Sequence, residues 1–450
     1  MLEETIKEIN EKKCTIEIFG LGYIGLPLAV RLACSSFFVI GIDINQERIA
    51  NLSQNNLNES EWEIKDDFET AYKNGKLSLS TTPQKYDVPK IGIISVPTPV
   101  PKPNFKSNVH VLSAVESFLK VAKKGDIIIL ESSLEIGATE EVQKLIESKG
   151  FIVGKDFGLA YCPERIDPQN KKWNLENIPR VIYCSDSFTF EICKFIYHHV
   201  NSGRLIKVST PKVAEIIKSF ENSFRLVNIS LVNELAILCD KLGISVREVI
   251  EGAATKPFGY APFYTGAGAG GHCIPKDPAF LAESSKKFGI EFQTIENALK
   301  INSLMPQYIT SSINKIFETQ KMNNKSIIIC GLSYKTDLED MRDSPGFKII
   351  YEMKKFGFKV VGYDPFYKKE LSHKYLLENN IPDSEIEIIP NLEDQSINNF
   401  SCLCIVQHHT KTKSRIDEIY TQSLIPIIYD CQNKLQFNSQ SNTILKTLGS

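Results

Sequence analysis

A glycine-rich turn between an apolar strand and a helix constrains the fold of the first third of the chain. The residues TIEIF (15–19) predict the strand, GLGYIG (20–25) follows at once, and LPLAVRLACSS (26–36) predicts the helix. In this setting the first glycine permits a tight turn, the second lets backbone approach a pyrophosphate, and the third permits close packing of helix on sheet. The helix N-terminus then faces the anion. We predict a dinucleotide site built by Gly20, Gly22, Tyr23, Ile24 and Gly25.

An acid at the end of the next strand indicates which dinucleotide would bind. The strand FFVIGID ends at Asp43, about 20 residues beyond the glycines, where a carboxylate takes the ribose 2′-hydroxyl. A carboxylate at this place repels a 2′-phosphate, so NAD is favoured over NADP. Arg48 lies nearby and is the one feature that would suit the phosphate.

Polar residues follow three more predicted strands. Pro97 and Thr98 follow the strand IGIISV (91–96), and Ser133 follows the strand DIIIL (126–130). Glu164 and Arg165 follow the strand GLAYC (158–162). Ligands of an open parallel sheet bind outside the carboxyl ends of its strands. We therefore expect Thr98, Ser133 and Glu164 at a binding edge, although a turn or a cap would explain each hydroxyl equally well.

Composition narrows the class of protein. A chain of 450 residues predicts two or three domains, and 42% hydrophobic with 24% charged residues is typical of a globular protein. The net charge of -2 offers no attraction to nucleic acid or to an anionic membrane. The eleven cysteines follow no secreted pattern, the N-terminus does not resemble a signal peptide, and no apolar run approaches the ~20 residues of a membrane helix. We predict a cytoplasmic protein with no nucleic-acid or membrane partner.

One cysteine stands in a setting suited to nucleophilic chemistry. In GAGAGGHCIPKDP (266–278), Cys273 follows glycines that would let a substrate approach closely, and Lys276 and Asp277 come within the reach of one turn. An ammonium group favours the thiolate, which is the nucleophilic form. The alternative for Cys273 is an inert core thiol, the fate expected of most of the other cysteines.

The same segment contains a second match to the glycine fingerprint, at Gly266, Gly268 and Gly271. No strand precedes these glycines, and the prolines of CIPKDP oppose a helix after them. We therefore expect no dinucleotide at this second match.

Residues 209–243 predict one long helix, capped by Ser209 or Thr210 and ended by Gly243. Its apolar residues surround most of the axis, so we expect burial between domains or subunits. Four polar residues recur at spacings of three and four: Glu215, Lys218, Asn222 and Arg225. They form either an internal salt-bridge row or a polar strip that lines a cleft.

The last third predicts a second Rossmann-like unit without a pyrophosphate loop. This unit consists of a strand in KSIIICGLSYK (325–335), a helix around DSPGFKIIYEMKKFG and the strand FKVVGYDP. We expect it to bind something other than a dinucleotide, or nothing. A metal site is suggested by two cysteines and two histidines near the C-terminus: Cys402, Cys404, His408 and His409. No spacing among them matches a structural zinc pattern. The better interpretation is that the cysteines of SCLCIV are core thiols. We predict no metal.

The motifs stand in a recognisable order: GLGYIGLP, VPTP, ESS, PER, KSFEN, GGHCIPKDP, GLSYKTDLEDMRDSP and YDP. This order resembles the UDP-glucose/GDP-mannose dehydrogenase family over essentially the whole chain. PERIDP, VNISLVNELA and PFYTGAGAGGHCIPKDP resemble most the dehydrogenases of UDP-N-acetylhexosamines, first those of UDP-N-acetylglucosamine and next those of UDP-N-acetylmannosamine. UDP-N-acetylmannosamine and UDP-glucose are the alternative substrates.

The resemblance implies an α/β fold with two Rossmann-like parallel-sheet domains joined by a long central helix. It implies an NAD-binding domain at 1–207, a central helical domain that forms a homodimer or higher oligomer at 208–320, and a UDP-sugar-binding domain at 321–450. The implied activity is oxidation of a sugar C6 hydroxyl to a carboxylate in two hydride transfers to NAD.

The resemblance also implies roles for individual residues. Cys273 matches the nucleophile, Lys218 and Asn222 the pair that stabilises an oxyanion, Asp277 the group that holds a water, and Glu164 the acid/base carboxylate. On the substrate side it implies Glu164, Arg165, Lys218, Phe263, Tyr264, Gly266 and Lys335. On the cofactor side it implies Arg48, Pro97, Thr98, Ser133 (where many members carry threonine) and Arg342, besides the glycine turn and Asp43.

The chain differs from the resembled family at two places that bear on the choice of sugar. Gln169 stands where a glycine is usual. Segment 407–416 lacks the usual pattern, in which one acidic residue is paired with one histidine. Two rival functions stay open. One is a single-step oxidation or epimerisation in which Cys273 is only structural. The other is a protein that senses NAD or a nucleotide sugar without turnover.

Overall fold

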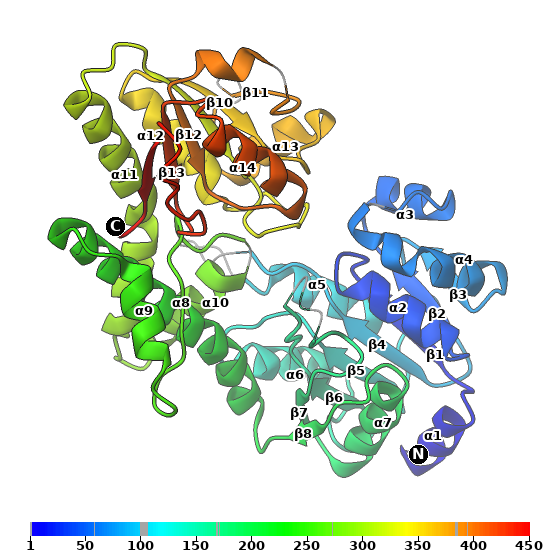
Figure 1. Ribbon diagram of the computed structural model, residues 1–450. Helices are drawn as coiled ribbons and strands as arrows, with labels where there is room; N and C mark the ends of the chain where they lie inside the picture. Colours follow the sequence, from blue (N-terminus) through cyan, green and yellow to red (C-terminus); the bar gives the residue numbers. More distant parts are fainter. Residues whose placement is uncertain are drawn as a thin grey trace. The chain divides into compact units, whose positions relative to one another are not determined.

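The chain divides into two compact units in the computed structural model, which describes residues 2–57, 59–99, 107–167, 170, 172–271, 273–382, 386–393 and 395–450. Unit 1 comprises Met1–Glu221 with Phe280–Ile290, and unit 2 comprises Asn222–Ala279 with Glu291–Ser450. Figure 1 colours the chain in sequence order from blue to red. Gln169 lies outside the described residues.

Unit 1 is built on an eight-stranded sheet in the order β3-β2-β1-β4-β5-β6-β7-β8, parallel except for the antiparallel pair β6–β7. The strands are β1 (Thr15–Phe19), β2 (Phe38–Ile42), β3 (Leu77–Ser80), β4 (Lys90–Ile94), β5 (Ile127–Leu130), β6 (Gly158–Tyr161), β7 (Arg180–Cys184) and β8 (Leu205–Lys207). The helices are α1 (Leu2–Asn10), α2 (Gly25–Cys34), α3 (Gln46–Ser53), η1 (Glu59–Ile64), α4 (Lys65–Lys73), α5 (Val109–Leu119), α6 (Ala138–Ser148) and α7 (Ser187–His198).

The central strands of unit 1 are apolar on both faces, as a parallel sheet covered by helices requires. In β1, which pairs with β2 and β4, every residue is buried. Ile16 and Ile18 join the core on one face, while Phe19 joins the core on the other. Strand order reverses between β1 and β4, which defines the crevice where this fold binds ligands.

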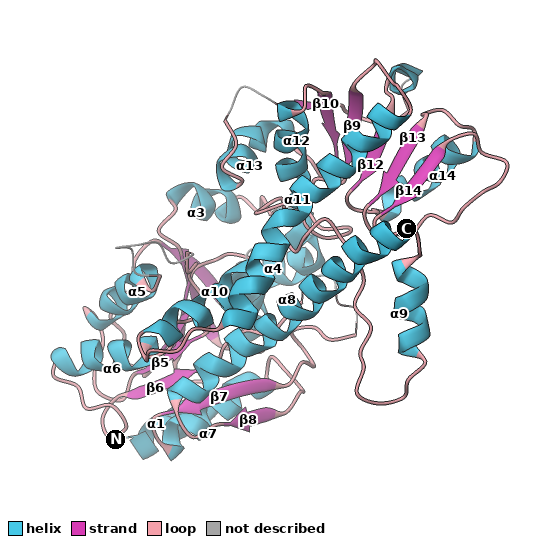
Figure 2. Cartoon of the chain, turned by 90° about the vertical axis from the view of Figure 1, so that its left-hand side faces the viewer, coloured by secondary structure: helices cyan, strands magenta, loops and turns pink. Residues whose placement is uncertain are grey.

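Unit 2 repeats this strand order in a six-stranded, fully parallel sheet, β11-β10-β9-β12-β13-β14. The strands are β9 (Ser326–Cys330), β10 (Lys359–Tyr363), β11 (Glu387–Ile388), β12 (Cys402–Ile405), β13 (Ile427–Asp430) and β14 (Ile444–Thr447). Beside them stand α9 (Val246–Ala254), α11 (Gln293–Thr319), α12 (Pro345–Lys355), η2 (Lys369–Leu371), α13 (Ser372–Glu378), η3 (Gln395–Asn399), η4 (Thr410–Thr412) and α14 (Lys413–Thr421). Helix α11 packs beside α12, which lies on β9 and β10 (Figure 2).

Two helices contribute residues to both units. Helix α8 (Pro211–Leu242) is the predicted long helix, with the Val213 amide donating to Thr210 Oγ1 at 3.3 Å and Gly243 following at a φ of 65°. Helix α10 (Cys273–Lys286) begins at the candidate nucleophile. The predicted α/β class, with two Rossmann-like sheets and a long central helix, is confirmed.

The expectation that prolines prevent a helix after Gly271 is wrong, because α10 contains both of them. Pro275 is the third residue of the helix, where a backbone N–H would have no partner within the helix. Pro278 lies deeper and removes one bond to the carbonyl four residues earlier.

Burial of α8 between domains or subunits stays a prediction, because part of the helix is uncovered in the single chain. Several of its large apolar side chains are 37% to 61% exposed: Val213, Ile216, Phe220, Phe224, Leu231, Leu238 and Leu242. They recur at spacings of three, four and seven, which places them along one side of the helix. Among the described residues, no helix is both long enough and apolar enough to span a membrane.

Candidate functional site

The glycine turn of unit 1 has the geometry that a pyrophosphate site requires. Gly20 has a φ of 91°, and a Cβ on Gly25 would stand 1.9 Å from the Gly20 carbonyl oxygen. A Cβ on Gly22 would meet nothing within 4 Å, so the space above this residue is open. Helix α2 has no side-chain cap and no acid in its first turn, so no side-chain charge opposes an anion at its positive N-terminal end.

Asp43 and Arg48, the two charged residues beside the turn, make different hydrogen bonds. Asp43 accepts hydrogen bonds from the amides of Leu21 and Asn45, both at 2.9 Å, and so ties the end of β2 to the turn. Arg48 donates to the Leu21 carbonyl at 2.9 and 3.0 Å and pairs with Glu61 through both terminal nitrogens at 3.2 and 2.5 Å. Since the guanidinium braces the turn and pairs with an acid, it gives no support to a 2′-phosphate.

Substituting the glycines separates binding from folding. We expect Gly22→Ala to lower NAD affinity without loss of stability, because the added methyl enters only the open space. We expect Gly25→Ala to lower both, with roughly 1–3 kcal/mol lost from the overpacked turn. Calorimetric titration with NAD and thermal unfolding distinguish the two outcomes. Gly252→Ala on α9, where the methyl also meets nothing, is the control.

The predicted binding edge of unit 1 carries the expected residues. Thr98 is buried, Pro97 is exposed and Ser133 is half-buried after β5. Ser132, which the sequence analysis did not select, donates to the Val96 carbonyl at 2.7 Å and ties the ends of β4 and β5.

Glu164 lies at the end of β6 and is only 9% exposed. One of its oxygens accepts the amides of Arg165 and Ile166 at 2.6 and 2.7 Å, and the other accepts from Arg180 at 2.5 Å. Arg180 begins β7, a strand that the sequence analysis did not predict, and its only signal is an arginine at the start of an apolar run, PRVIYC. The neighbouring Arg165 pairs with Glu221 at 2.6 and 3.1 Å.

In unit 2, helix α10 aligns the residues around the candidate nucleophile. Cys273 is its first residue, and Lys276 and Asp277 follow at i+3 and i+4, so all three share one face. Negative charge is favoured at the start of a helix. Cys273 is exposed, whereas every other cysteine except Cys34 is buried.

Asp277 is brought together with a second predicted residue. The Asn222 side-chain amide donates to Asp277 Oδ2 at 2.6 Å, and the two side chains are 8% and 0% exposed. Lys276, which was expected to favour the thiolate, is buried with its ammonium 3.9 Å from Asp277 Oδ1. Lys218 is buried in unit 1, one turn before Asn222 on α8.

The glycine loop before Cys273 is fixed at several points within unit 2. Asn233 Oδ1 accepts the Gly266 amide at 3.1 Å, and Asn302 exchanges two hydrogen bonds with the Ala269 backbone at 2.6 and 3.0 Å. A Cβ on Gly271, whose φ is 80°, would stand 2.7 Å from the Tyr334 ring. These glycines therefore allow the loop to lie against its own unit. The two asparagines were missed, and the only signal for them is a polar residue within an apolar stretch of helix.

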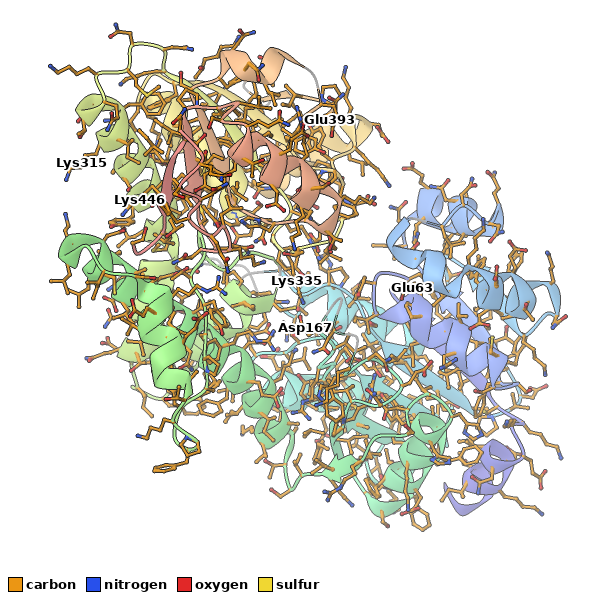
Figure 3. All side chains as sticks on the ribbon, in the orientation of Figure 1. Glu63, Asp167, Lys315, Lys335, Glu393 and Lys446 are labelled. Atoms are coloured by element: carbon orange, nitrogen blue, oxygen red, sulfur yellow. The ribbon has the colours of Figure 1, made fainter. Side chains whose placement is uncertain are left out.

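The remaining predicted residues of unit 2 are Phe263, Tyr264, Arg342 and Lys335. Phe263 is half-buried and packs edge-on against Phe224 at 6.0 Å, while Tyr264 is 54% exposed. Arg342 pairs with Asp340 at 2.5 Å, and its carbonyl accepts the Gly271 amide at 2.9 Å. Lys335, labelled in Figure 3, is half-buried in the segment after β9.

The four polar residues of α8 do not act as one row. Glu215 is fully buried and accepts the amides of Gly137 and Thr139 at 2.7 and 2.8 Å, so it caps the start of α6. Burial raises the pKa of Glu215, and these amides oppose the rise. Asn222 instead belongs to the cluster with Asp277, so the salt-bridge interpretation is wrong for both.

The turn of unit 2 repeats that of unit 1 but is closed by side chains. Gly331 has a φ of 90°, and the Leu332 amide donates to Asp364 at 2.7 Å, as Leu21 donates to Asp43. The same Asp364 oxygen accepts from the Ser333 amide at 2.7 Å and lies 3.0 Å from His409 Nε2. Asp364 is therefore occupied where a ribose-binding carboxylate would be needed.

The histidines and cysteines near the C-terminus lie in separate surroundings. His408 lies 2.9 Å from Asp430, and His409 lies 3.0 Å from Asp364. Cys402 and Cys404 are both fully buried on β12, as core thiols should be. Within the described residues no group of three potential ligands could hold a metal ion.

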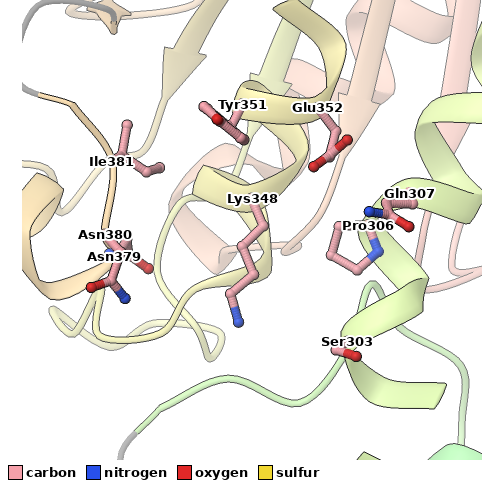
Figure 4. Close-up of a pocket in the computed structure, with 9 residues that line it drawn as sticks. All are labelled: Ser303, Pro306, Gln307, Lys348, Tyr351, Glu352, Asn379, Asn380 and Ile381. Atoms are coloured by element: carbon pink, nitrogen blue, oxygen red, sulfur yellow. The ribbon is translucent and has the colours of Figure 1, made fainter. Parts of the chain in front are cut away.

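A pocket of about 140 Å³ lies in unit 2, where α11 and α12 face residues 379–381 (Figure 4). Lys348 on its wall pairs with Asp343 at 2.5 Å. The described residues that line this pocket include none of those predicted for the site.

A glycine turn, an uncapped helix and an acid at the end of β2 in a doubly wound sheet define a dinucleotide-binding domain of the NAD type. Three sequence profiles of one family match the chain: the NAD binding domain at residues 14–201, the central domain at 212–304 and the UDP binding domain at 328–437. The chain belongs to the UDP-glucose/GDP-mannose dehydrogenase family, whose members oxidise nucleotide sugars.

Individual relatives resemble the chain along most of its length. It is 34% identical to a UDP-N-acetyl-D-mannosamine dehydrogenase of Methanococcus aeolicus, over 96% of this chain and 93% of that protein. It is 33% identical to a UDP-N-acetyl-D-glucosamine 6-dehydrogenase of Pseudomonas aeruginosa, over 81% and 86%. The solved UDP-D-ManNAc dehydrogenase of Pyrococcus horikoshii superposes with a TM-score of 0.83 at 27% identity, covering 97% of this chain and 99% of that one.

Proposed function

We propose that the protein oxidises the C6 hydroxyl of a UDP-N-acetylhexosamine to a carboxylate, in two hydride transfers with a covalent intermediate on Cys273. The observation that carries this proposal is the arrangement on α10, where an exposed thiol begins the helix and the buried Asp277–Asn222 pair lies one turn further on. The curated relatives named above act on the two epimers, UDP-N-acetylglucosamine and UDP-N-acetylmannosamine.

A covalent intermediate is needed because the aldehyde formed by the first oxidation must stay bound until the second. Oxidation of the alcohol removes one hydride and gives the aldehyde, to which the Cys273 sulfur adds to form a thiohemiacetal. Loss of a second hydride gives a thioester, and water hydrolyses it to the acid and the free thiol. Lys218 and Asn222 would stabilise the oxyanion of each addition, where one donor typically contributes about 3 kcal/mol.

Two carboxylates would handle the water and the proton. Asp277, held by Asn222, would orient the hydrolytic water, and Glu164 would take up its proton. Both side chains are buried, which suits groups that act away from bulk solvent.

NAD would bind at the turn of unit 1, where Gly22 leaves space, α2 presents its positive N-terminal end and Asp43 offers a carboxylate to the ribose. When bound, NAD supplies the hydride acceptor for both oxidations. We also propose that the cofactor site includes Tyr23, Ile24, Arg48, Pro97, Thr98, Ser133 and Arg342. We propose that the substrate site includes Arg165, Phe263, Tyr264, Gly266 and Lys335.

The exposed apolar side of α8 supports a homodimer in which a second copy covers it. The boundaries after residues 207 and 320 stay a prediction, and so does a homo-oligomer larger than a dimer.

The test is a panel of UDP-sugars assayed for NADH. We expect two NADH for each sugar consumed, with an N-acetylhexosamine preferred over UDP-glucose. A ratio of one would indicate single-step oxidation, and saturable binding without any NADH would indicate a sensor. Comparing the two epimers then identifies the sugar.

A further inference from the structure

A buried charge cluster stands directly behind Glu164 in unit 1. Arg180 and Glu131 are each 2% exposed, and Glu164 is 9% exposed. The Arg180 guanidinium donates through one terminal nitrogen to Glu131 at 2.9 Å and through the other to Glu164 at 2.5 Å. One cation therefore joins two carboxylates that follow adjacent strands, β5 and β6.

The orientation of Glu164 is determined from two sides. Backbone amides hold one of its oxygens, and Arg180 holds the other. If Arg180 were removed, the carboxylate would keep its backbone contacts but lose the contact that sets the rotation of the group. A misplacement of about 1 Å can cost a factor of about 10² in rate.

The charge balance of the cluster suits an acid/base group. An arginine paired with Glu164 alone would favour the carboxylate so strongly that proton uptake would be difficult. Glu131 shares the guanidinium and also accepts the Tyr197 hydroxyl at 2.5 Å. Two carboxylates around one guanidinium carry one excess negative charge, which favours the uptake of one proton.

The other titratable groups around the cluster do not offset this charge. Burial raises the pKa of the Cys162 thiol, 3.8 Å from Arg180, to about 12, so the thiol is neutral. Tyr197 is also neutral, because burial holds its pKa well above the ordinary value. Arg165 pairs with Glu221, so these two charges largely cancel. Burial, joined by the like charge of Glu164, raises the pKa of Glu131.

We propose that Arg180 and Glu131 are positioning residues for Glu164: Arg180 orients its carboxylate, and Glu131 balances the guanidinium so that Glu164 can still exchange a proton. This inference rests on the proposed role of Glu164. It assigns a function to Arg180, which lies in none of the sequence motifs, and to Glu131, the first residue of ESS, which had no role.

The cluster borders a cavity of unit 1 on a second side. Arg180 and Tyr197 line a pocket of about 830 Å³ in unit 1, together with Phe190, Phe195 and Leu205. A small cation could enter this pocket and replace a missing guanidinium group.

The experiment compares Glu131→Gln and Arg180→Met with the wild-type chain in the pH profile of kcat/KM. Glu131→Gln keeps the shape but removes one negative charge beside Glu164, so the acidic limb of the profile should move down by about one pH unit. Arg180→Met should lower kcat by about 10²-fold and move the limb upward. Added guanidinium at a non-denaturing concentration, or Arg180→Lys, should restore part of the activity.

The control is Glu191→Gln on α7, an exposed acid that also lines the pocket. It should leave the profile unchanged. A merely structural role for the cluster would lower the melting temperature and the amplitude of the profile without moving its limb, and that result would overturn the inference. If Arg180→Met does not fold, Glu131→Gln decides the question by itself.

The proposed function and this inference fail in different ways. Absence of NADH from wild-type protein with every UDP-sugar would overturn the proposed function. Active wild-type protein, an inactive Glu164→Gln variant, and unshifted limbs for Glu131→Gln and Arg180→Met would overturn only the inference.

Discussion

Replacing Cys273 with serine is expected to lower NADH formation from a UDP-N-acetylhexosamine on the order of a thousandfold or more, as when other enzymes lose their nucleophile. Serine keeps the size of the side chain but is a far weaker nucleophile at neutral pH, so the aldehyde is not captured. NAD affinity should be unchanged, because the glycine turn of unit 1 is untouched. Steady-state rates and calorimetric titration measure the two effects.

The matched control is Cys34→Ser, since Cys34 is the other exposed cysteine and lies on α2, outside the proposed chemistry. It should keep wild-type turnover. Mass spectrometry of wild-type protein quenched in acid during turnover should show the sugar acyl group on the peptide that contains Cys273. Full four-electron turnover by Cys273→Ser would refute the covalent step.

The second large effect is expected on stability, from Asp364→Asn in unit 2. Asp364 is buried and accepts the amides of Leu332 and Ser333 on one oxygen, which also faces His409, and the amide of Phe366 on the other. An amide nitrogen cannot accept these bonds, and a buried pair that loses one partner costs about 3–5 kcal/mol. We expect a clear fall in melting temperature and faster proteolysis of unit 2.

The pH dependence of this variant has a definite sign. Burial acts to raise the pKa of Asp364, but His409 and the backbone amides outweigh it and hold the pKa below its ordinary value. The carboxylate therefore stabilises the fold above pH about 4, and the contribution is lost as pH falls through the lowered folded-state pKa. Wild-type protein should lose stability in this acid range, and Asp364→Asn should lose less.

Asp417→Asn on α14 makes the same chemical change at an exposed position and is the control. It should melt like the wild type at every pH. A melting temperature for Asp364→Asn equal to that of Asp417→Asn would show that the contacts of Asp364 do not stabilise unit 2.

Much of unit 1 was predictable because its signals are local. The alternation of TIEIF, the glycine turn and the acid that ends β2 are each read within a few residues, and the structure has β1, α2 and β2 within two residues of the predicted ends. Helix α10 was not predicted, since two prolines outweigh its other residues locally. Its first turn tolerates Pro275, and tertiary packing supports the rest.

The residues proposed for the chemistry could be found from their identities and spacings along the chain: the turn at Gly20, the acid at Asp43 and a cysteine behind glycines. The pairing of polar groups, in contrast, became known from the three-dimensional fold. Glu215 caps α6, Asn222 holds Asp277, Asp364 faces His409, and Arg180 joins Glu131 to Glu164. These pairs lie from 16 to 78 residues apart. A buried charge is stable only where the fold provides its partner, and no local sequence pattern records that partner.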